Sequence, residues 1–255
     1  MRLFVREYGT GFPVVILHGL FGSGENFRSF ATGLSKEYRV ILPDMRNHGM
    51  SPHASGMSYH LLAKDVADTL DSLDIPCCHL IGHSLGGKAA MEFALEFPSR
   101  VKKLVVVDIA PKSYDPKDPE ALPALKALHL ASFSNRQEIE EALSPLIPDR
   151  RMRLFLMKNI VREDSGAFSL RIGLHEMENG YSDIWGGLEG GRSVSCAALF
   201  LRGENSDLVA EDDIGLIRQF FPQAEVKTVR NAGHWVQVDQ PEEFSSLVRS
   251  FLSGT

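Results

Sequence analysis

Short, continuously apolar segments alternate with amphipathic segments along much of this 255-residue chain. Residues 13–17 read Pro-Val-Val-Ile-Leu, the pattern of a strand that is covered by helices on both faces. Behind Ser58, apolar residues recur at helical spacing as far as Leu73, which predicts a capped amphipathic helix. Strands that alternate with helices are typical of a parallel sheet with helices on both sides. The expected strands cover residues 2–8, 13–17, 39–42, 78–81, 103–108, 197–202 and 224–228.

This alternation stops at Pro111 and resumes at about residue 193. No strand is evident between these points. Helix-like stretches cover residues 120–131, 135–143 and 150–161, and proline and glycine separate them. We therefore expect a core made of residues 1–111 and 193–255, and a helical lid (cap) made of residues 112–192.

Composition narrows the class of protein. Hydrophobic residues make up 44% of the chain and charged residues 24%, which indicates a globular protein with a sizeable core. The net charge of −6 and the lack of a basic block argue against nucleic acid or an anionic membrane as a partner. No apolar run approaches the roughly 18 residues of a membrane span, and the first residues read as a strand, not a targeting peptide. We expect a cytoplasmic protein.

The three cysteines, Cys77, Cys78 and Cys196, have the spacing of neither a disulfide framework nor a zinc site. Cys78 and Cys196 lie in apolar runs and are expected to be small core residues. We predict no metal and no cofactor.

Residues 82–86, Gly-His-Ser-Leu-Gly, follow an expected strand and precede a stretch of strong helix formers. Strand, Gly-x-Ser-x-Gly and helix in this order predict a nucleophile elbow. Gly82 and Gly86 would let the chain pass close to itself at the sharp turn. Ser84 would then stand at its tip, with its hydroxyl exposed as a nucleophile.

A serine hydroxyl needs a base to take its proton. His234 follows the last expected strand, and the order serine then histidine matches α/β-hydrolases. We expect His83 to pack inside the elbow and His18 to brace the loop after residues 13–17.

The acid that orients His234 has two candidates. The loop after the penultimate strand often carries Gly-x-x-Asp-x-x-Val, but this chain has Ser206 at the aspartate position and Asp207 one position later. Asp108 closes an apolar strand next to the elbow strand, where a carboxylate without a partner would be costly. We favour Asp108 and keep Asp207 as the alternative.

Ester chemistry also needs donors for the oxygen that becomes negative. The backbone N–H groups of Leu20 and Leu85 are the expected oxyanion-hole donors. Phe21 and Trp185 could line an apolar substrate pocket, although core packing would explain both equally well.

Five motifs stand out together: His18-Gly19-Leu20-Phe21-Gly22-Ser23, Asp44-x-Arg46-Asn47-His48-Gly49-x-Ser51, Gly82-His83-Ser84-Leu85-Gly86-Gly87-Lys88-Ala89, Asp108-Ile109-Ala110-Pro111 and Asn231-Ala232-Gly233-His234-Trp235-Val236. This set resembles the bacterial YbfF-type esterases and their animal relatives, the alpha/beta-hydrolase domain-containing protein 11 group. The resemblance implies that the aspartate of Asp-Ile-Ala-Pro, here Asp108, is the acid. It also implies the α/β-hydrolase fold. We expect a mostly parallel eight-stranded sheet, helices on both faces and a helical lid inserted after the sixth strand.

The expected function is that of a serine hydrolase of the carboxylesterase type, which cleaves carboxylic esters or thioesters of small to medium acyl groups through an acyl-enzyme on Ser84. The expected partner is a small-molecule ester or thioester. A ligand-binding receptor and an acyltransferase on the same fold are the alternatives. The lid cations Arg150, Arg151, Arg153, Lys158 and Arg162 form either a solvated surface or, if one turns inward, a site for an anionic substrate tail.

Overall fold

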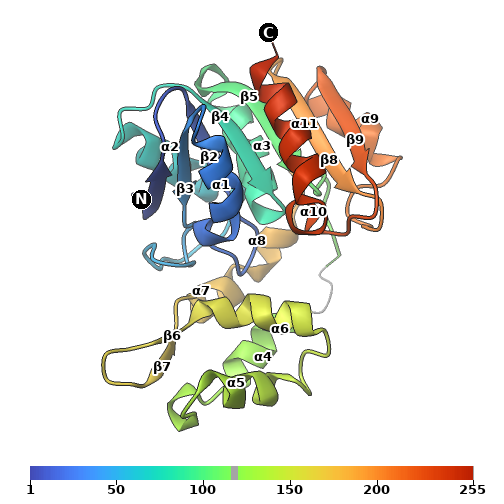
Figure 1. The fold of residues 1–255 in the computed structure, drawn as a ribbon. Coiled ribbons are helices and arrows are strands. Elements are labelled where there is room, and N and C mark those ends of the chain that lie inside the picture. The colour runs from blue at the N-terminus through green and yellow to red at the C-terminus, as the bar shows by residue number, and fades with distance from the viewer. Residues whose placement is uncertain (116–119, 255) are drawn as a thin grey trace.

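A single large sheet organises the core. The computed structural model describes residues 1–115 and 120–254. Within them the strand order is β1-β3-β2-β4-β5-β8-β9, and β1 is antiparallel to β3 while the other pairs are parallel (Figure 1). The strands are β1 (Val5–Tyr8), β2 (Pro13–Leu17), β3 (Arg39–Pro43), β4 (Cys78–His83), β5 (Val101–Val107), β8 (Ala197–Gly203) and β9 (Ala224–Val229).

Helices cover both faces of this sheet, as the continuously apolar strands predict. Alternate residues of β2 show why: Val15 and Leu17 pack in the cluster on one face, and Val14 and Ile16 in the cluster on the other. Each such fully buried side chain contributes about 1.5–3 kcal/mol of transfer free energy. One face is covered by α2 (Tyr59–Asp71), α3 (Leu85–Glu96) and α9 (Asp213–Phe220), the other by α1 (Arg28–Leu34) and α11 (Pro241–Ser253).

The mostly parallel sheet with helices on both faces is thereby confirmed, but the expected number of strands is wrong. The sheet has seven strands within the described residues, not eight. Each of the seven segments expected to be strands supplies one strand of this sheet, and none of them supplies an eighth. The lid segment therefore follows β5, the fifth strand along the chain, and not a sixth.

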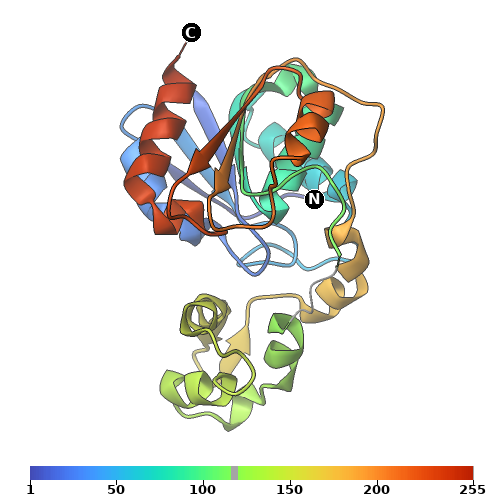
Figure 2. The ribbon, with the colours of Figure 1, turned by 90° about the vertical axis from the view of Figure 1, so that its right-hand side faces the viewer.

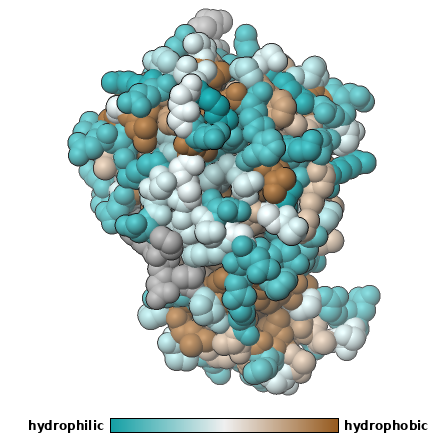
Figure 3. Space-filling view, turned by 180° about the vertical axis from the view of Figure 1, so that it is seen from behind, coloured by the Kyte–Doolittle hydropathy of each residue, from teal (hydrophilic) through white to brown (hydrophobic). Residues whose placement is uncertain are grey.

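Between β5 and β8 the chain forms a second layer next to the core (Figures 1 and 2). Its apolar side chains pack in a cluster of their own, which includes Leu125, Leu143 and Leu156. Seen from behind, apolar residues gather on this lid, whereas the core surface above it is mostly hydrophilic (Figure 3). The helices of the lid are α4 (Ala121–Ala127), α5 (Arg136–Leu143), α6 (Arg150–Leu156), α7 (Leu174–Asn179) and α8 (Tyr181–Trp185).

The lid also contains a β-hairpin that the sequence did not predict. Strands β6 (Ile160–Arg162) and β7 (Phe168–Leu170) pair antiparallel, and β6 begins where a helix was expected to continue. Strands of three residues are too short to show a period of two in the sequence. Gly166, with φ at +86°, lies in the turn between them.

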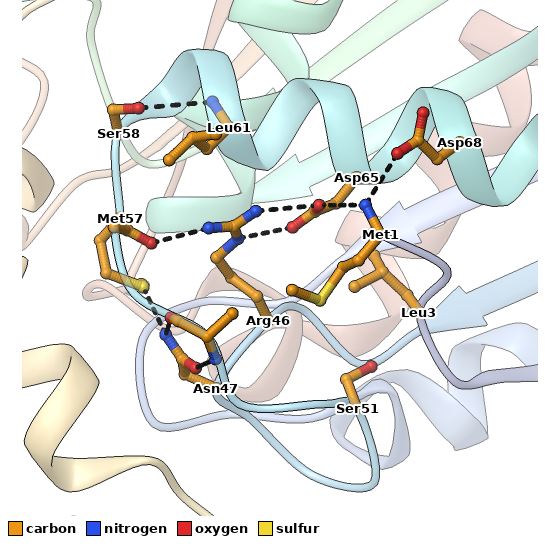
Figure 4. A network of polar contacts seen from close by, with 12 residues as sticks. Met1, Leu3, Arg46, Asn47, Ser51, Met57, Ser58, Leu61, Asp65 and Asp68 are labelled. Atoms are coloured by element: carbon orange, nitrogen blue, oxygen red, sulfur yellow. Dashed lines mark hydrogen bonds and ion pairs between the residues drawn. The ribbon is translucent and has the colours of Figure 1, made fainter.

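A buried ion pair fixes the loop that follows β3 (Figure 4). Arg46 is 5% exposed and binds Asp65 of α2 through two bonds, Nε to Oδ2 at 2.6 Å and Nη2 to Oδ1 at 2.9 Å. Its Nη1 atom donates to the carbonyls of Ser55 and Gly56. The Met1 amino nitrogen lies 2.7 Å from Oδ1 of the same Asp65. This bidentate geometry holds the loop from residue 46 to residue 56 against α2.

No helix in the described part of the chain combines the length and the apolar character that crossing a membrane requires. The same residues contain no group of three or more histidine, cysteine or acidic side chains placed to hold a metal ion.

Candidate active site

Ser84 lies at the sharp turn between β4 and α3. Its backbone has φ at +53° and ψ at −120°, a strained conformation that residues other than glycine rarely adopt. A Cβ atom on Gly82 would lie 2.2 Å from the carbonyl oxygen of Gly86, and one on Gly86 would lie 2.4 Å from that of Leu17. Both glycines are therefore required by close approach of the backbone, as the motif predicts. The turn leaves Ser84 partly exposed at the edge of the sheet.

The structure places Asp108, and not Asp207, against His234. Asp108 follows β5, is 1% exposed and has φ at +52°. Its Oδ2 atom lies 2.9 Å from Nδ1 of His234. The backbone N–H of Gly203 donates to its Oδ1 atom at 2.9 Å, and the Ser206 hydroxyl donates to Oδ2. Three donors thus compensate the buried carboxylate, whereas Asp207 is exposed.

Ser206 takes part in this arrangement in a way that the sequence did not show. It stands where related motifs carry the acid, and its hydroxyl reaches the carboxylate of Asp108 from that position. The departure from Gly-x-x-Asp-x-x-Val was the available signal, but it did not reveal what the serine contacts.

The bond from His234 to Asp108 selects one tautomer of the imidazole. If Nδ1 donates to the carboxylate, Nε2 carries a lone pair that can accept a proton. The side chain of His234 is 36% exposed, so this second nitrogen has access to the cavity beside it.

His83 supports the other side of the His234 loop. Its Nε2–H group donates to the carbonyl of His234 at 2.8 Å, and the two rings lie 4.6 Å apart between centroids. Burial and, to a smaller extent, the neighbouring imidazole of His234 lower the pKa of His83 to about 3. The ring therefore stays neutral at physiological pH. His83 packs inside the elbow, as expected.

Ser84 and His234 line one cavity of about 550 Å³ between the core and the lid. Among the described residues no hydrogen bond joins their side chains, and such bonds often tighten only when substrate is bound. Leu20, Phe21 and Trp185 line the same cavity, so the structure brings the predicted pocket residues to the predicted nucleophile. Leu85 follows Ser84 directly as the first residue of α3.

The loop after β2, which carries Leu20, is held in place from two sides. Phe21 has φ at +59°. Its backbone N–H donates to Nε2 of His48 at 3.1 Å, and its carbonyl accepts from Nδ2 of Asn159 at 2.8 Å. Asn159 belongs to the lid, and His48 belongs to the loop after β3. The lid therefore binds the backbone beside Leu20 directly.

His18 braces this loop, as expected. Its Nε2 atom accepts from the N–H of Met45 at 2.9 Å, and its Nδ1–H donates to the carbonyl of Gly19 at 2.8 Å. His48 uses the same pattern, because its Nδ1–H donates to the carbonyl of Arg46 at 2.8 Å. Both rings must be neutral to accept at Nε2. Burial lowers the pKa of His18, and it lowers the pKa of His48 still more.

One lid arginine reaches the cavity. Arg151 lines it, but Nη2 of Arg151 lies 2.6 Å from Oδ1 of Asp239, and its guanidinium stacks 5.4 Å above the ring of Trp235. An anionic substrate tail would have to compete with the Asp239 carboxylate for this group. By contrast, Arg150 pairs with Glu140 on the lid, and Arg153 donates to lid carbonyls.

Known proteins resemble this chain over nearly its whole length. The family described as "alpha/beta hydrolase fold" matches residues 13–241. The sn-1-specific diacylglycerol lipase ABHD11 of Mus musculus is 39% identical over 248 residues, which cover 94% of this chain and 80% of that protein. Esterase YbfF of Escherichia coli is 34% identical over 94% of this chain and 93% of its own. A solved structure described as a marine microorganism esterase has a TM-score of 0.95 and 41% identity, covering 98% and 99% of the two chains.

Proposed function

The chain belongs to the alpha/beta hydrolase fold family, and from that premise we propose that it is a serine hydrolase that cleaves carboxylic esters or thioesters through an acyl-enzyme on Ser84. The resemblance to YbfF-type esterases and ABHD11 that the motifs indicated is confirmed by the comparisons. Those relatives are named as an esterase and as a diacylglycerol lipase, so esterase-type hydrolysis is the activity that they share. Beyond this shared activity, we propose the catalytic residues, the acyl-enzyme intermediate and the size of the acyl group.

In the first half of the reaction, the Ser84 oxygen attacks the ester carbonyl while Nε2 of His234 takes the hydroxyl proton. The bond from carbonyl carbon to alcohol or thiol then breaks, and the imidazolium returns this proton to the leaving group. Asp108 holds the imidazole in the tautomer with a free Nε2 and stabilises its charge. In the second half, water adds to the acyl-enzyme by the same proton route and releases the acid and Ser84.

The negative oxygen of each tetrahedral intermediate needs donors that are already in position. We assign this role to the backbone N–H groups of Leu85 and Leu20. Leu85 follows the nucleophile at the N-terminus of α3, a helix of twelve residues whose dipole favours negative charge at that end. Leu20 lies in the loop that His48 and Asn159 hold through Phe21.

The observation that carries the proposal is the hydrogen bond from His234 to the buried Asp108 beside a serine in an elbow conformation. The Asp108 carboxylate binds the imidazole of His234, and His234 and Ser84 line one cavity at this edge of the sheet. Packing alone does not require a partly exposed imidazole to be oriented by a carboxylate that is itself held by Gly203 and Ser206.

The cavity supports acyl groups of small to medium length. Its volume of about 550 Å³ lies within the range of small-molecule sites. Leu20, Phe21, Met152, Phe155 and Trp185 are among its lining residues, and their side chains are apolar for most of their surface. An acyl chain that packs against both core and lid fits this lining better than a strongly polar substrate does.

A panel of p-nitrophenyl and CoA esters of graded acyl length tests the proposal. We expect turnover by the wild-type protein, and a loss in kcat on the order of 10⁴-fold or more for Ser84→Ala and for His234→Ala. Ser132→Ala in the lid and His60→Ala on α2 replace exposed residues of the same types and serve as matched controls. Near-normal turnover by the Ser84→Ala variant would overturn the assignment.

The same panel separates the two alternatives. A ligand-binding receptor would release about one equivalent of product and then stall. An acyltransferase would form product in proportion to an added alcohol acceptor and leave little free acid. Sustained release of free acid at a rate independent of added alcohol supports hydrolysis.

A further inference from the structure

Lys88 is a buried lysine on the helix that begins at the proposed nucleophile. Lys88 is 1% exposed, and its backbone N–H donates to the carbonyl of Ser84 one turn earlier. The lysine contributes no atom to the cavity that holds Ser84 and His234. The proposed reaction therefore leaves the presence of a buried amine unexplained.

The amine of Lys88 reaches both points at which the lid joins the core. Its Nζ atom donates to the carbonyl of Lys112 at 2.7 Å and to the carbonyl of Gly186. Residue 112 follows the last core residue before the lid, and residue 186 follows α8, the last lid helix. We call residues 111–114 and 185–188 the two hinge segments.

The hinge segments also bind each other. The N–H of Leu188 donates to the carbonyl of Pro111 at 2.9 Å, and the N–H of Tyr114 donates to the carbonyl of Trp185 at 2.8 Å. Lys88 lies beneath this pair and joins it to α3. Trp185 lines the substrate cavity, so the position of the second hinge segment affects the cavity wall.

The surroundings of Lys88 offer aromatic rings and carbonyl oxygens. Nζ lies 4.7 Å from the ring centroid of Tyr114 and 5.2 Å from that of Tyr59. The hydroxyls of these tyrosines bind elsewhere, Tyr114 to the carbonyl of Leu208 and Tyr59 to that of Ile184. Glu92, one helical turn beyond Lys88, pairs with Arg192 through two bonds.

A buried amine with no carboxylate among its described partners is costly, because two carbonyls and two aromatic rings compensate a full charge only in part. A methionine would fill most of the same space without a charge. What the amine supplies, and methionine cannot, is a set of N–H donors for two carbonyls on separate segments. The two acceptors both belong to the hinge, so the contacts point to a role in lid position.

We propose that Lys88 is a positioning residue that clamps both hinge segments of the lid to the nucleophile helix and thereby sets the wall of the substrate cavity. This role rests on the proposed hydrolase function for its effect on substrates. The clamp itself is a contact between α3 and the two hinge segments, and it does not depend on the hydrolase function.

The charge state of Lys88 gives the clamp a pH dependence. Burial and, to a smaller extent, the nearby positive charge of Lys112 lower the pKa of Lys88 to about 7. The other groups that face this site are the phenols of Tyr59 and Tyr114, Asp213 of α9, which pairs with Lys112 at 2.6 Å, and Asp183 of α8 near Tyr59.

The stability of the closed clamp depends on pH because opening of the hinge changes the pKa of Lys88. Opening of the hinge returns the amine to water, where its pKa is about 10.4. Opening therefore takes up a proton between about pH 7 and pH 10, and the closed clamp loses stability as the pH falls through that window.

Hydrogen exchange of the two hinge segments, followed by mass spectrometry, tests the clamp. We compare wild-type protein with Lys88→Met, which keeps an unbranched side chain, one atom shorter, but removes the donors. Lys103→Met is the matched control, because Lys103 also donates to backbone carbonyls, those of Phe251 and Leu252, far from the lid. We expect exchange in residues 111–114 and 185–188 to become several-fold faster in Lys88→Met at pH 9.5, where proton uptake by the wild-type amine favours opening far less than at pH 7.5, because buried hydrogen bonds are lost, and to stay unchanged in Lys103→Met.

Ester kinetics supply a second readout. In Lys88→Met we expect KM for an octanoyl ester to rise by about fivefold or more, and kcat for the acetyl ester to stay within about twofold, because the short acyl group does not need the lid wall. Equal losses for both esters would overturn the positioning role. If neither wild-type nor variant cleaves any ester, the proposed function fails, and the exchange data still decide the clamp.

A wild-type pH series covers the case in which Lys88→Met does not fold. After correction for intrinsic exchange rates, we expect opening of the hinge segments to increase by several-fold or more as the pH falls from 9.5 to 7.5. Exchange that does not change with pH in these segments, or that does not change on substitution of Lys88, would overturn the proposal.

Discussion

The Oδ2 atom of Asp108 lies 2.9 Å from Nδ1 of His234, although the two residues are 126 positions apart in the chain. Asp108 ends up there because β5 is the neighbour of the elbow strand β4 in the sheet. The loop after β8, which holds Asp207, contributes the Ser206 hydroxyl to the same carboxylate. The acid and its support thus come from adjacent strand ends.

We expect Asp108→Asn to lower kcat by about 10³-fold to 10⁴-fold, because an amide can donate to His234 and so favours the wrong tautomer. Asp207→Asn should stay within about twofold of wild type, because Asp207 is exposed and Asp108 is the carboxylate that binds the imidazole. Steady-state kinetics on one p-nitrophenyl ester check both. A large loss in Asp207→Asn together with a small loss in Asp108→Asn would reverse the assignment.

The bond from Asn159 to Phe21 couples the lid to the loop of the proposed oxyanion hole. We expect Asn159→Ala to lower kcat by about tenfold, because the carbonyl of Phe21 loses a buried partner and the N–H of Leu20 loses its fixed orientation. The same change should cost about 1–3 kcal/mol of unfolding free energy. Asn179→Ala, an exposed asparagine elsewhere on the lid, is the control. Loss of stability with unchanged kcat would show that Asn159 has only a structural role.

Much of the core could be predicted because its causes are local. The seven segments expected to be strands each form one, and the glycines of the elbow are needed at a turn within their own motif. Asp108 could be favoured because a carboxylate at the end of an apolar strand needs a partner.

The remaining features depend on contacts between distant segments. Asn159 lies 138 positions from Phe21, and nothing in the residues around Asn159 indicates that its amide turns toward the core. The clamp at Lys88 depends on where two hinge carbonyls lie once the lid has folded. The short hairpin of β6 and β7 was missed for a different reason, because three residues do not establish a period.

Buried neutral histidines should make the protein sensitive to acid. Burial lowers the pKa of His18 and His48 below the ordinary value of 6.5. Above that value both rings are neutral in the folded and unfolded states, so their contribution to stability is complete. As the pH falls below 6.5, the unfolded state takes up protons first, and each histidine costs up to about 1.4 kcal/mol per pH unit.

Urea unfolding at intervals from pH 7.5 to pH 4.5 measures this effect. We expect the free energy of unfolding to fall across this range, and to fall less steeply in His48→Gln, whose side-chain oxygen can still accept from Phe21. His129→Gln replaces an exposed histidine and should leave the slope unchanged. A slope that His48→Gln does not alter would mean that His48 is not the group that titrates.

The ion pair of Arg46 and Asp65 provides a last test, because it anchors the loop that carries His48 (Figure 4). Arg46→Met leaves the buried Asp65 carboxylate with the Met1 amino group as its remaining ion-pair partner among the described residues, so the change should cost about 3 kcal/mol of unfolding free energy. Removing both, in Arg46→Met with Asp65→Leu, should recover part of that loss, since two apolar side chains of similar size need no compensation. A double-mutant cycle measured by urea unfolding gives the coupling free energy between Arg46 and Asp65.

Because Arg46 also holds the carbonyls of Ser55 and Gly56, the double variant should regain stability without regaining full kcat. Full recovery of both quantities would show that the loop needs only a filled core, and not the guanidinium, to keep His48 against Phe21.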